Sequence, residues 1–278
     1  MGLRLTWREK TSLPVDASGL VPKALASLAL LDLARLPIPV GNRAAEIGEL
    51  FDVEADPRAP DDHLRVIGSL QHVRNLGQGL SCGTLEVDGT VGPYLGLGMS
   101  GGQILVHGDV GDGAGSEMTG GLLRIDGSAG DSLGANRPGS RSGMRDGVIL
   151  VSGSAGNEVG RKMRRGLIAI QGDAADGVGR LLIAGTIFVF GRVGIGAGMG
   201  MKRGTLGLFG ADPRSILPTF KETGQYRFPF LTIYFRQLSE WGYAVPAALS
   251  TAMMRRYNGD LATRGLGEIL VADHTAQD

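Results

Sequence analysis

The sequence predicts a mainly β chain whose middle, residues 62–210, is a single-stranded parallel β-helix of about seven to eight coils. The first observation is a set of glycines at regular distances: Gly83, Gly102, Gly121, Gly147, Gly166, Gly185 and Gly204. Their spacings are 19, 19, 26, 19, 19 and 19 residues, and the longer one contains a seven-residue insertion within 135–146. A fixed short period of this kind is typical of a solenoid, in which each unit stacks on the one before it.

The second observation is an alternating apolar pattern after each glycine, of the form G-x-φ-x-φ-x-G. The fourteen φ positions are all Leu, Ile or Val: Leu85/Val87, Ile104/Val106, Leu123/Ile125, Ile149/Val151, Ile168/Ile170, Ile187/Val189 and Leu206/Leu208. Alternation over five residues predicts a strand with one buried face, and glycine at both ends disfavours a helix. An irregular earlier coil is expected over 62–82, where Leu64, Val66 and Gly68 match the pattern.

Further apolar columns recur at the same period. One of them contains five of the nine methionines, at Met99, Met118, Met144, Met163 and Met201. We therefore expect like side chains to stack in an interior, with glycines at corners where φ is positive or backbones approach closely. The central prediction is that Leu85, Ile104, Leu123, Ile149, Ile168 and Ile187 lie one above another.

Two flanking segments complete the chain. Residues 1–61 predict a small α/β lobe that caps the first coil, with a strand near Leu3–Arg8 and a helix near Pro22–Leu36. Residues 211–278 predict an aromatic and helical extension, with a helix over Pro246–Tyr257. Such caps are expected because the open strand edges of a solenoid favour aggregation.

Phe188, Phe190 and Phe209 occupy outward strand positions on the last coils. Three exposed rings in one patch are unfavourable in water. Either the C-terminal tail folds back over them, or they form an interface with a partner protein. We expect the chain to behave poorly alone because of these three rings.

Composition excludes several classes of protein. Lys+Arg and Asp+Glu both number 28, so net charge indicates neither nucleic-acid nor membrane binding. Cys82 is the only cysteine, which excludes a disulfide framework, a cysteine-ligated zinc site and an iron–sulfur cluster held by this chain alone. The first ten residues lack an apolar signal core, and the apolar run over 20–40 is interrupted by charges and prolines. A cytoplasmic protein is expected.

Candidate catalytic and metal sites are sparse. The glycine-rich stretches 96–102 and 194–204 resemble phosphate-binding loops, but glycines recur in every coil and no crossover helix follows, which favours structural corners. The histidines, His63, His72, His107 and His274, are scattered without metal-ligand spacing. We therefore expect no catalytic residue and no metal site in this chain.

One cluster of charged residues stands out in the sequence, and it is basic. From 135 to 203 there are eleven bases and four acids, whereas from 83 to 134 there are seven acids and one base. The candidate contact residues are Arg161, Lys162, Arg164, Arg165, Lys202 and Arg203. In stacked coils they would share a face, which is either simply solvated or a contact for an acidic protein surface or an anionic cofactor tail.

The repeats carry a family resemblance. The segments GTLEVDGTVGPYLGLGMSGG, GQILVHGDVGDGAG, GVILVSGSAGNEVG and GTIFVFGRVGIGAGMGMKRG resemble the GXGXG β-helix domain, which also ends the large subunit of glutamate synthase. Together with the trailing segment RRYNGDLATRGLGEILV, they resemble the C subunit of formylmethanofuran dehydrogenase and that of the bacterial formyltransferase/hydrolase complex.

The resemblance implies a non-catalytic structural subunit in one-carbon metabolism. In the bacterial complex a formyl group passes from tetrahydromethanopterin to a methanofuran analogue and is hydrolysed to formate, as part of formaldehyde oxidation. The implied partners are an amidohydrolase-like subunit that holds zinc, a second dehydrogenase-like subunit and a formyltransferase subunit. Methanofuran-type cofactors carry glutamate-rich tails, which the basic residues would suit.

Three alternatives stay open. The first is the C subunit of a methanogenic, CO2-reducing formylmethanofuran dehydrogenase. The second is a glutamate-synthase-type module in amide-nitrogen metabolism, and the third is a free-standing binding protein. Arg outnumbers Lys by 23 to 5, which indicates a GC-rich bacterial genome and favours the bacterial complex.

Overall fold

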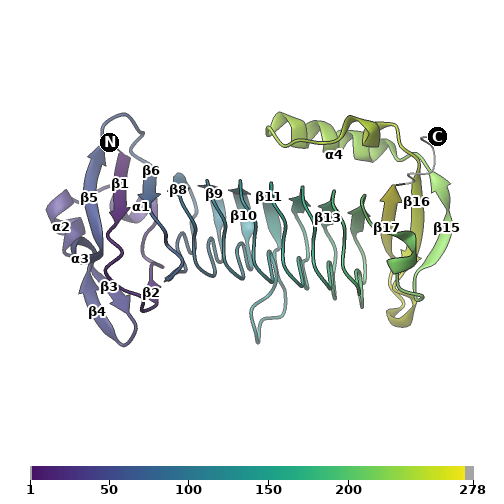
Figure 1. Cartoon of the computed structure of the whole chain (residues 1–278), viewed down its shortest axis with the longest axis horizontal. Helices are drawn as coiled ribbons and strands as arrows, with labels where there is room; N and C mark the ends of the chain where they lie inside the picture. Colours follow the sequence, from purple (N-terminus) through teal and green to yellow (C-terminus); the bar gives the residue numbers. More distant parts are fainter. Residues whose placement is uncertain (1, 273–278) are drawn as a thin grey trace.

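The computed structural model describes residues 2–272, and its main feature is a 13-stranded sheet. Eight of its strands pair in parallel in the order of the chain, interrupted only by β7 of a second sheet, so that the molecule is elongated in the direction of stacking (Figure 1). These strands are β6 (His63–Ile67), β8 (Thr84–Asp88), β9 (Ser100–Val106), β10 (Thr119–Ile125), β11 (Asp146–Val151), β12 (Leu167–Ile170), β13 (Thr186–Val189) and β14 (Thr205–Leu208).

The predicted register is confirmed. Leu85 pairs with Ile104, Ile104 with Leu123, and the column continues through Ile149, Ile168 and Ile187. All six side chains are fully buried. The insertion leaves this column intact, because Leu123 still lies opposite Ile149 across the longer spacing. The prediction of a mainly β chain with a large parallel sheet is therefore correct.

A second, narrower ladder of parallel bridges runs beside the strands. It joins Leu70, Val91, Val110, Ala129, Ala155, Ala174 and Val193, one from each successive repeat. Corners between the two ladders need glycine. At Gly89, where φ is 137°, a Cβ atom would lie 2.1 Å from the carbonyl oxygen of Gly68 in the previous coil.

The N-terminal lobe closes the first end of the stack. Strand β1 (Gly2–Trp7) lies close to the bounds predicted for the first strand. It pairs in parallel with β6 and antiparallel with β5 (Phe51–Asp56). A small second sheet contains β2 (Val15–Asp16), β3 (Pro37–Val40), β4 (Arg43–Glu46) and β7 (Val73–Arg74).

The single helix predicted over Pro22–Leu36 is wrong. The segment instead forms two short helices, α1 (Pro22–Leu25) and α2 (Leu30–Ala34), and a third, α3 (Ile47–Leu50), precedes β5. Ala29 has an extended backbone with ψ of 148°, which separates the first two. Leu25 and Leu33 are both buried, so each short helix contributes its own side chain to the core.

The C-terminal tail closes the other end. Strand β14 pairs in parallel with β17 (Gly267–Ala272), and β17, β16 (Met254–Gly259) and β15 (Lys221–Tyr226) continue the sheet in antiparallel order. Short 3-10 turns lie at Pro213–Ser215, Ala247–Ser250 and Leu261–Thr263.

The helix predicted over Pro246–Tyr257 is also wrong. That segment holds a 3-10 turn and most of β16, whereas the helix is α4 (Pro229–Glu240), further upstream. Leu231, Phe235 and Leu238 are its buried residues, at the spacing of one helical face. Residues from Met254 onward pair with β17 instead, which gives their backbone a sheet partner.

Helix α4 and the residues after it lie over the outer face of the later strands (Figure 1). Phe188 and Phe209 are fully buried there, and the rings of Phe188, Phe190 and Phe209 pack against Phe235 at 5.5–6.3 Å between centroids. The tail therefore covers these phenylalanines, and the alternative of an exposed partner interface at the three rings is wrong. The physical reason is the apolar face of α4, a helix that was not predicted from the sequence.

None of the helices within residues 2–272 combines the length and apolarity that a bilayer crossing requires. The division of the chain at residues 61 and 210 stays a prediction.

Candidate functional site

The outer face of the large sheet changes character along the stack. Over β11–β14 it is apolar and lies under α4 and the tail. Over β6–β10 it is polar, with the following side chains: His63, Arg65, Glu86, Asp88, His107, Arg124 and Asp126. These seven residues, called the histidine–carboxylate network below, come from successive coils.

His107 lies at the centre of this network. Its Nδ1 atom is 2.7 Å from Asp126 Oδ2, and its Nε2 atom is 3.3 Å from Glu86 Oε1. The other oxygen of Glu86 lies 3.0 Å from Nε2 of His63. The hydrogen bond with Asp126 raises the pKa of His107 above its ordinary value, and this effect outweighs the opposing influence of partial burial.

Register explains why these residues meet. Leu105 lies opposite Glu86 on one side and Arg124 on the other. Two residues further along each strand, His107 therefore lies between Asp88 and Asp126. Arg65 Nε donates to Asp88 Oδ2 at 2.6 Å. At the other end of the network, Arg124 donates to the carbonyl oxygen of Trp241 at 2.7 Å, and Trp241 is the residue that follows α4.

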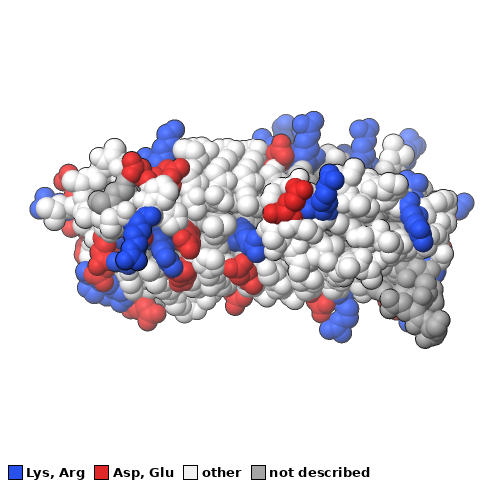
Figure 2. All heavy atoms as spheres, turned by 90° about the horizontal axis from the view of Figure 1, so that it is seen from above, with Lys and Arg blue, Asp and Glu red and all other residues white. Residues whose placement is uncertain are grey.

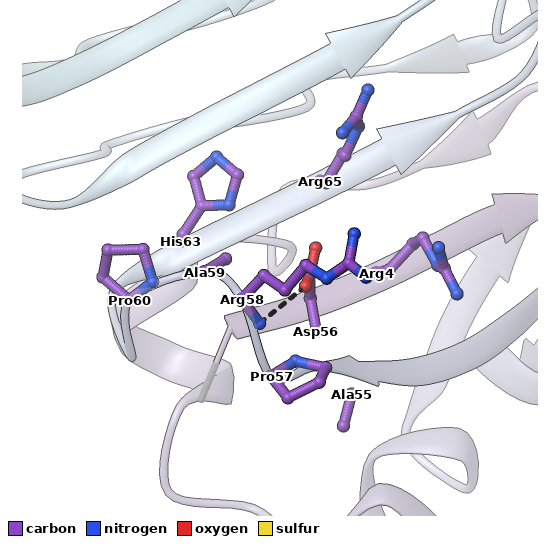
Figure 3. A pocket seen from close by; sticks show the side chains of 9 residues that line it. All are labelled: Arg4, Ala55, Asp56, Pro57, Arg58, Ala59, Pro60, His63 and Arg65. Atoms are coloured by element: carbon purple, nitrogen blue, oxygen red, sulfur yellow. Dashed lines mark hydrogen bonds between the residues drawn. The ribbon is translucent and has the colours of Figure 1, made fainter.

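A pocket of about 700 Å³ opens beside His63 (Figure 3). It is lined by Arg4, Arg65, His63 and the segment 55–60. Arg4 is paired with Glu54 and Arg65 with Asp88, so the positive charge of these two guanidinium groups is largely balanced. The pocket, which Arg58 also lines, gives solvent access to His63 and Arg65 of the network.

A second concave surface, called the basic groove below, carries the basic residues predicted from the sequence. It has a volume of about 450 Å³ and contains these side chains: Arg164, Arg165, Lys202, Arg203 and Arg264, with Ile183, Ala184, Thr263 and Leu266. Among residues 2–272, none of its four arginines nor Lys202 has a carboxylate within ion-pair distance. The coils and the C-terminal turn thus bring five unbalanced cations together.

Two of the predicted basic residues lie outside this groove. Arg161 donates to Glu158 Oε2 at 2.7 Å and to Asn136 Oδ1 at 3.0 Å, so it is held by contacts within the chain. Lys162 occupies a corner with φ of 55° and does not line the groove. Figure 2 shows acidic and basic side chains intermixed around the N-terminal lobe, with basic ones predominating along one long edge toward the C-terminal end.

The histidine–carboxylate network was not predicted from the sequence, because the histidines are scattered along the chain without metal-ligand spacing. A signal was present: His107 and Asp126 are 19 residues apart, which is one repeat. His72 is exposed elsewhere, and His274 lies outside the described residues. Glu86, Asp88 and His107 each offer one potential metal-ligand atom within 4.8 Å of the others.

Curated relatives and a solved structure, rather than a family model, show which family the chain belongs to. No family model matches it. It is 44% identical over 57 residues to the C subunit of the Fhc formyltransferase/hydrolase complex of Methylorubrum extorquens, covering 20% of this chain and 21% of the relative. It is 33% identical over 93 residues to the C subunit of the tungsten-containing formylmethanofuran dehydrogenase 2 of Methanothermobacter wolfeii, covering 33% of this chain and 34% of the relative. The chain thus aligns with about a third or less of the length of these curated relatives.

A solved structure gives an end-to-end match. In the crystal structure of the formyltransferase/hydrolase complex FhcABCD from Methylorubrum extorquens with methylofuran, one chain superimposes with a TM-score of 0.89 and 36% identity, covering 98% of this chain and 100% of that chain. The protein belongs to the family of formylmethanofuran dehydrogenase and Fhc C subunits. The resemblance to these C subunits is therefore confirmed, and the structural match extends over both end lobes as well as the stack.

Proposed function

We propose that this member of the family is a non-catalytic structural subunit of a cytoplasmic formyltransferase/hydrolase complex in one-carbon metabolism. In that complex a formyl group passes from tetrahydromethanopterin to a methanofuran analogue and is then released as formate. The observation that carries the proposal is the match over 98% of the chain to a chain of FhcABCD. The middle of the chain would serve as a parallel β-helix scaffold between two capping lobes.

The side chains support a structural role. His63 and His107 contact carboxylates, and no hydroxyl or thiol group lies among their side-chain contacts in the described part of the chain. We place the reaction in other subunits: an amidohydrolase-like subunit with zinc, a second dehydrogenase-like subunit and a formyltransferase subunit. The four-letter composition of the FhcABCD complex supports a hetero-oligomer of this kind.

The test is co-purification from the native host. A tagged copy of the chain is isolated, and the proteins that accompany it are identified by mass spectrometry. We expect the formyltransferase and the amidohydrolase-like subunit. Recovery of the chain alone, or with an amidotransferase, would overturn the proposal.

A methanogenic type of complex is the second candidate, because local matches include tungsten- and molybdenum-containing formylmethanofuran dehydrogenases. Metal analysis of the same purified complex separates the two. Zinc without molybdenum or tungsten is expected for the formyltransferase/hydrolase type, whereas molybdenum or tungsten would indicate the second.

We also propose that the basic groove contacts an anionic group, the glutamate-rich tail of the methanofuran analogue. Five cations without a carboxylate partner among the described residues surround an open groove, which favours a polyanion. An acidic surface of another subunit has the same charge and is the competing occupant.

The groove is tested in the assembled complex by replacing Arg164, Arg165, Lys202 and Arg203 with Ala. The KM for the cofactor should rise about tenfold or more, since even exposed pairs contribute up to about 1 kcal/mol each, while kcat is unchanged. The control removes four exposed charges from the N-terminal lobe: Lys10, Lys23, Arg35 and Arg43. An unchanged KM would exclude the tail, and loss of a subunit from the complex would identify the acidic surface instead.

A further inference from the structure

We propose that Glu86, Asp88 and His107 form a binding site for a divalent transition-metal ion, with Zn²⁺ as the best-suited ion. The three potential ligand atoms lie within 4.8 Å of one another. One imidazole nitrogen and two carboxylate oxygens are a ligand set that zinc uses, and three protein ligands leave a fourth position for water. The inference concerns this chain alone and does not depend on the proposed function.

The two ring nitrogens of His107 are in different situations. The Nδ1 contact with Asp126, at 2.7 Å, has the length of a charge-assisted hydrogen bond. The Nε2 contact with Glu86, at 3.3 Å, is too long for one. This asymmetry favours the tautomer in which Nδ1–H donates to Asp126, so the Nε2 lone pair faces Glu86.

A lone pair facing a carboxylate is unfavourable unless a proton or a metal ion lies between them, and the long separation of 3.3 Å between Nε2 and Oε1 leaves room for a metal ion bound to both. The arrangement matches the carboxylate–histidine–metal pattern, in which a second carboxylate orients the ligating imidazole and increases its basicity. Asp126 is therefore assigned as a positioning residue and His107 as a ligand.

His63 performs the corresponding role for Glu86. Its Nε2 atom lies 3.0 Å from Glu86 Oε2, which leaves Oε1 directed toward His107. The Nδ1 atom of His63 is buried and has no hydrogen-bond partner within residues 2–272. His63 therefore donates through Nε2 to the carboxylate and fixes the orientation of the potential ligand.

Access and competition both bear on the site. The side chain of His107 is 45% exposed, so an ion can reach its ring from solvent. Arg65 occupies Oδ2 of Asp88, which leaves Oδ1 for an ion. The competing arrangement is an ion-pair network without metal, in which His107 is protonated and bridges Asp126 and Glu86.

The experiment is calorimetric titration of ZnCl2 into the metal-free, full-length chain. We expect saturable binding of one ion, weakened at least tenfold in His107→Ala and in Glu86→Gln. Asp126→Asn leaves all three ligands in place and should weaken binding by about 10- to 100-fold through loss of orientation. The matched control is His72→Ala, which removes an exposed imidazole outside the network and should bind as the unaltered chain does.

Circular dichroism and thermal unfolding of each variant verify that it is folded. If His107→Ala does not fold, Glu86→Gln and Asp126→Asn carry the test. Absence of saturable binding to the unaltered chain would overturn the proposal in favour of the metal-free network. Binding that all three network variants retain would also overturn it, because the ion would then lie elsewhere.

Discussion

The hydroxyl group of Tyr243 donates a hydrogen bond to the carbonyl oxygen of Val151 at 2.8 Å, although the two residues are 92 positions apart. The contact fastens the segment after α4 to the C-terminal end of β11, a strand that lies between β10 and β12. Burial raises the pKa of Tyr243, so the phenol stays protonated and keeps its hydrogen for the bond. It marks the point where the tail meets the middle of the stack.

Tyr243→Phe should lower the free energy of unfolding by about 1 kcal/mol. The loss is moderate because the carbonyl oxygen of Val151 also accepts from the Gln171 amide at 2.9 Å and keeps that partner. Urea unfolding of both proteins measures the difference. A loss close to zero would show that the tail is not fastened by this bond in solution.

Phe188→Ala should be more damaging, by about 3–5 kcal/mol, because it opens a cavity beneath α4. The ring is fully buried and packs against Phe209, Tyr234 and Phe235. Ile195→Ala is the control: its side chain is 71% exposed, so the change should stay within about 0.5 kcal/mol. Equal effects in the two variants would mean that the tail does not cover Phe188.

Gly89→Ala tests the close approach of neighbouring coils. Its Cβ atom would meet the carbonyl oxygen of Gly68 at 2.1 Å, and φ is 137°, so we expect destabilisation of about 3 kcal/mol or more. Gly79→Ala is the matched comparison. Gly79 also has a positive φ, 67°, but nothing lies within 4 Å of its Cβ position, so backbone strain alone should cost about 1–2 kcal/mol. Thermal unfolding ranks the two, and the reverse order would contradict the stacking geometry.

Asp260 should make stability depend on pH. Burial by itself raises the pKa of Asp260, but hydrogen bonds from the Gly200 and Ala262 amides, both 2.9 Å, outweigh it and bring the pKa below its ordinary value of 3.8. The folded state then binds the proton more weakly than the unfolded state. The stabilisation is therefore complete above pH 3.8 and is lost as pH falls below that value toward the lowered folded-state pKa.

Asp260→Asn removes this pH-dependent contribution. Near neutral pH the variant should be less stable by about 1.5–3 kcal/mol, the range for hydrogen bonds to charged groups. The difference should shrink in acid, which urea unfolding between about pH 3 and pH 7 measures. A difference that is constant over this range would show that ionisation of Asp260 does not stabilise the fold.

The parallel stack was the most predictable part of the molecule, because period and alternation together determine register. The column from Leu85 to Ile187 follows directly from residues 19 apart, and the insertion after Gly134 changes only the loop. The lobes were less predictable, because their short elements depend on tertiary contacts. Ala29 interrupts one expected helix, and pairing with β17 converts the expected C-terminal helix into β16.

The candidate sites differ in the same way. The basic groove follows from a charge count plus the period, although only the structure adds Arg264 and removes Arg161. The histidine–carboxylate network depends on outward positions of several coils, where no single residue stands out. Glu86 and His107 are 21 residues apart, which differs from the 19-residue period. The sequence spacing therefore does not reveal that the register of β8 and β9 brings these two side chains together.

Both ends of the stack finish in antiparallel strands, β5 at one side and β15 at the other. Coils between them can be added or deleted without altering either terminus of the sheet, since every coil offers the same ladder to its neighbour. Each insertion of one repeat would move the two lobes apart by about 4.8 Å, the distance between adjacent strands. The number of repeats therefore sets the distance between the two terminal lobes.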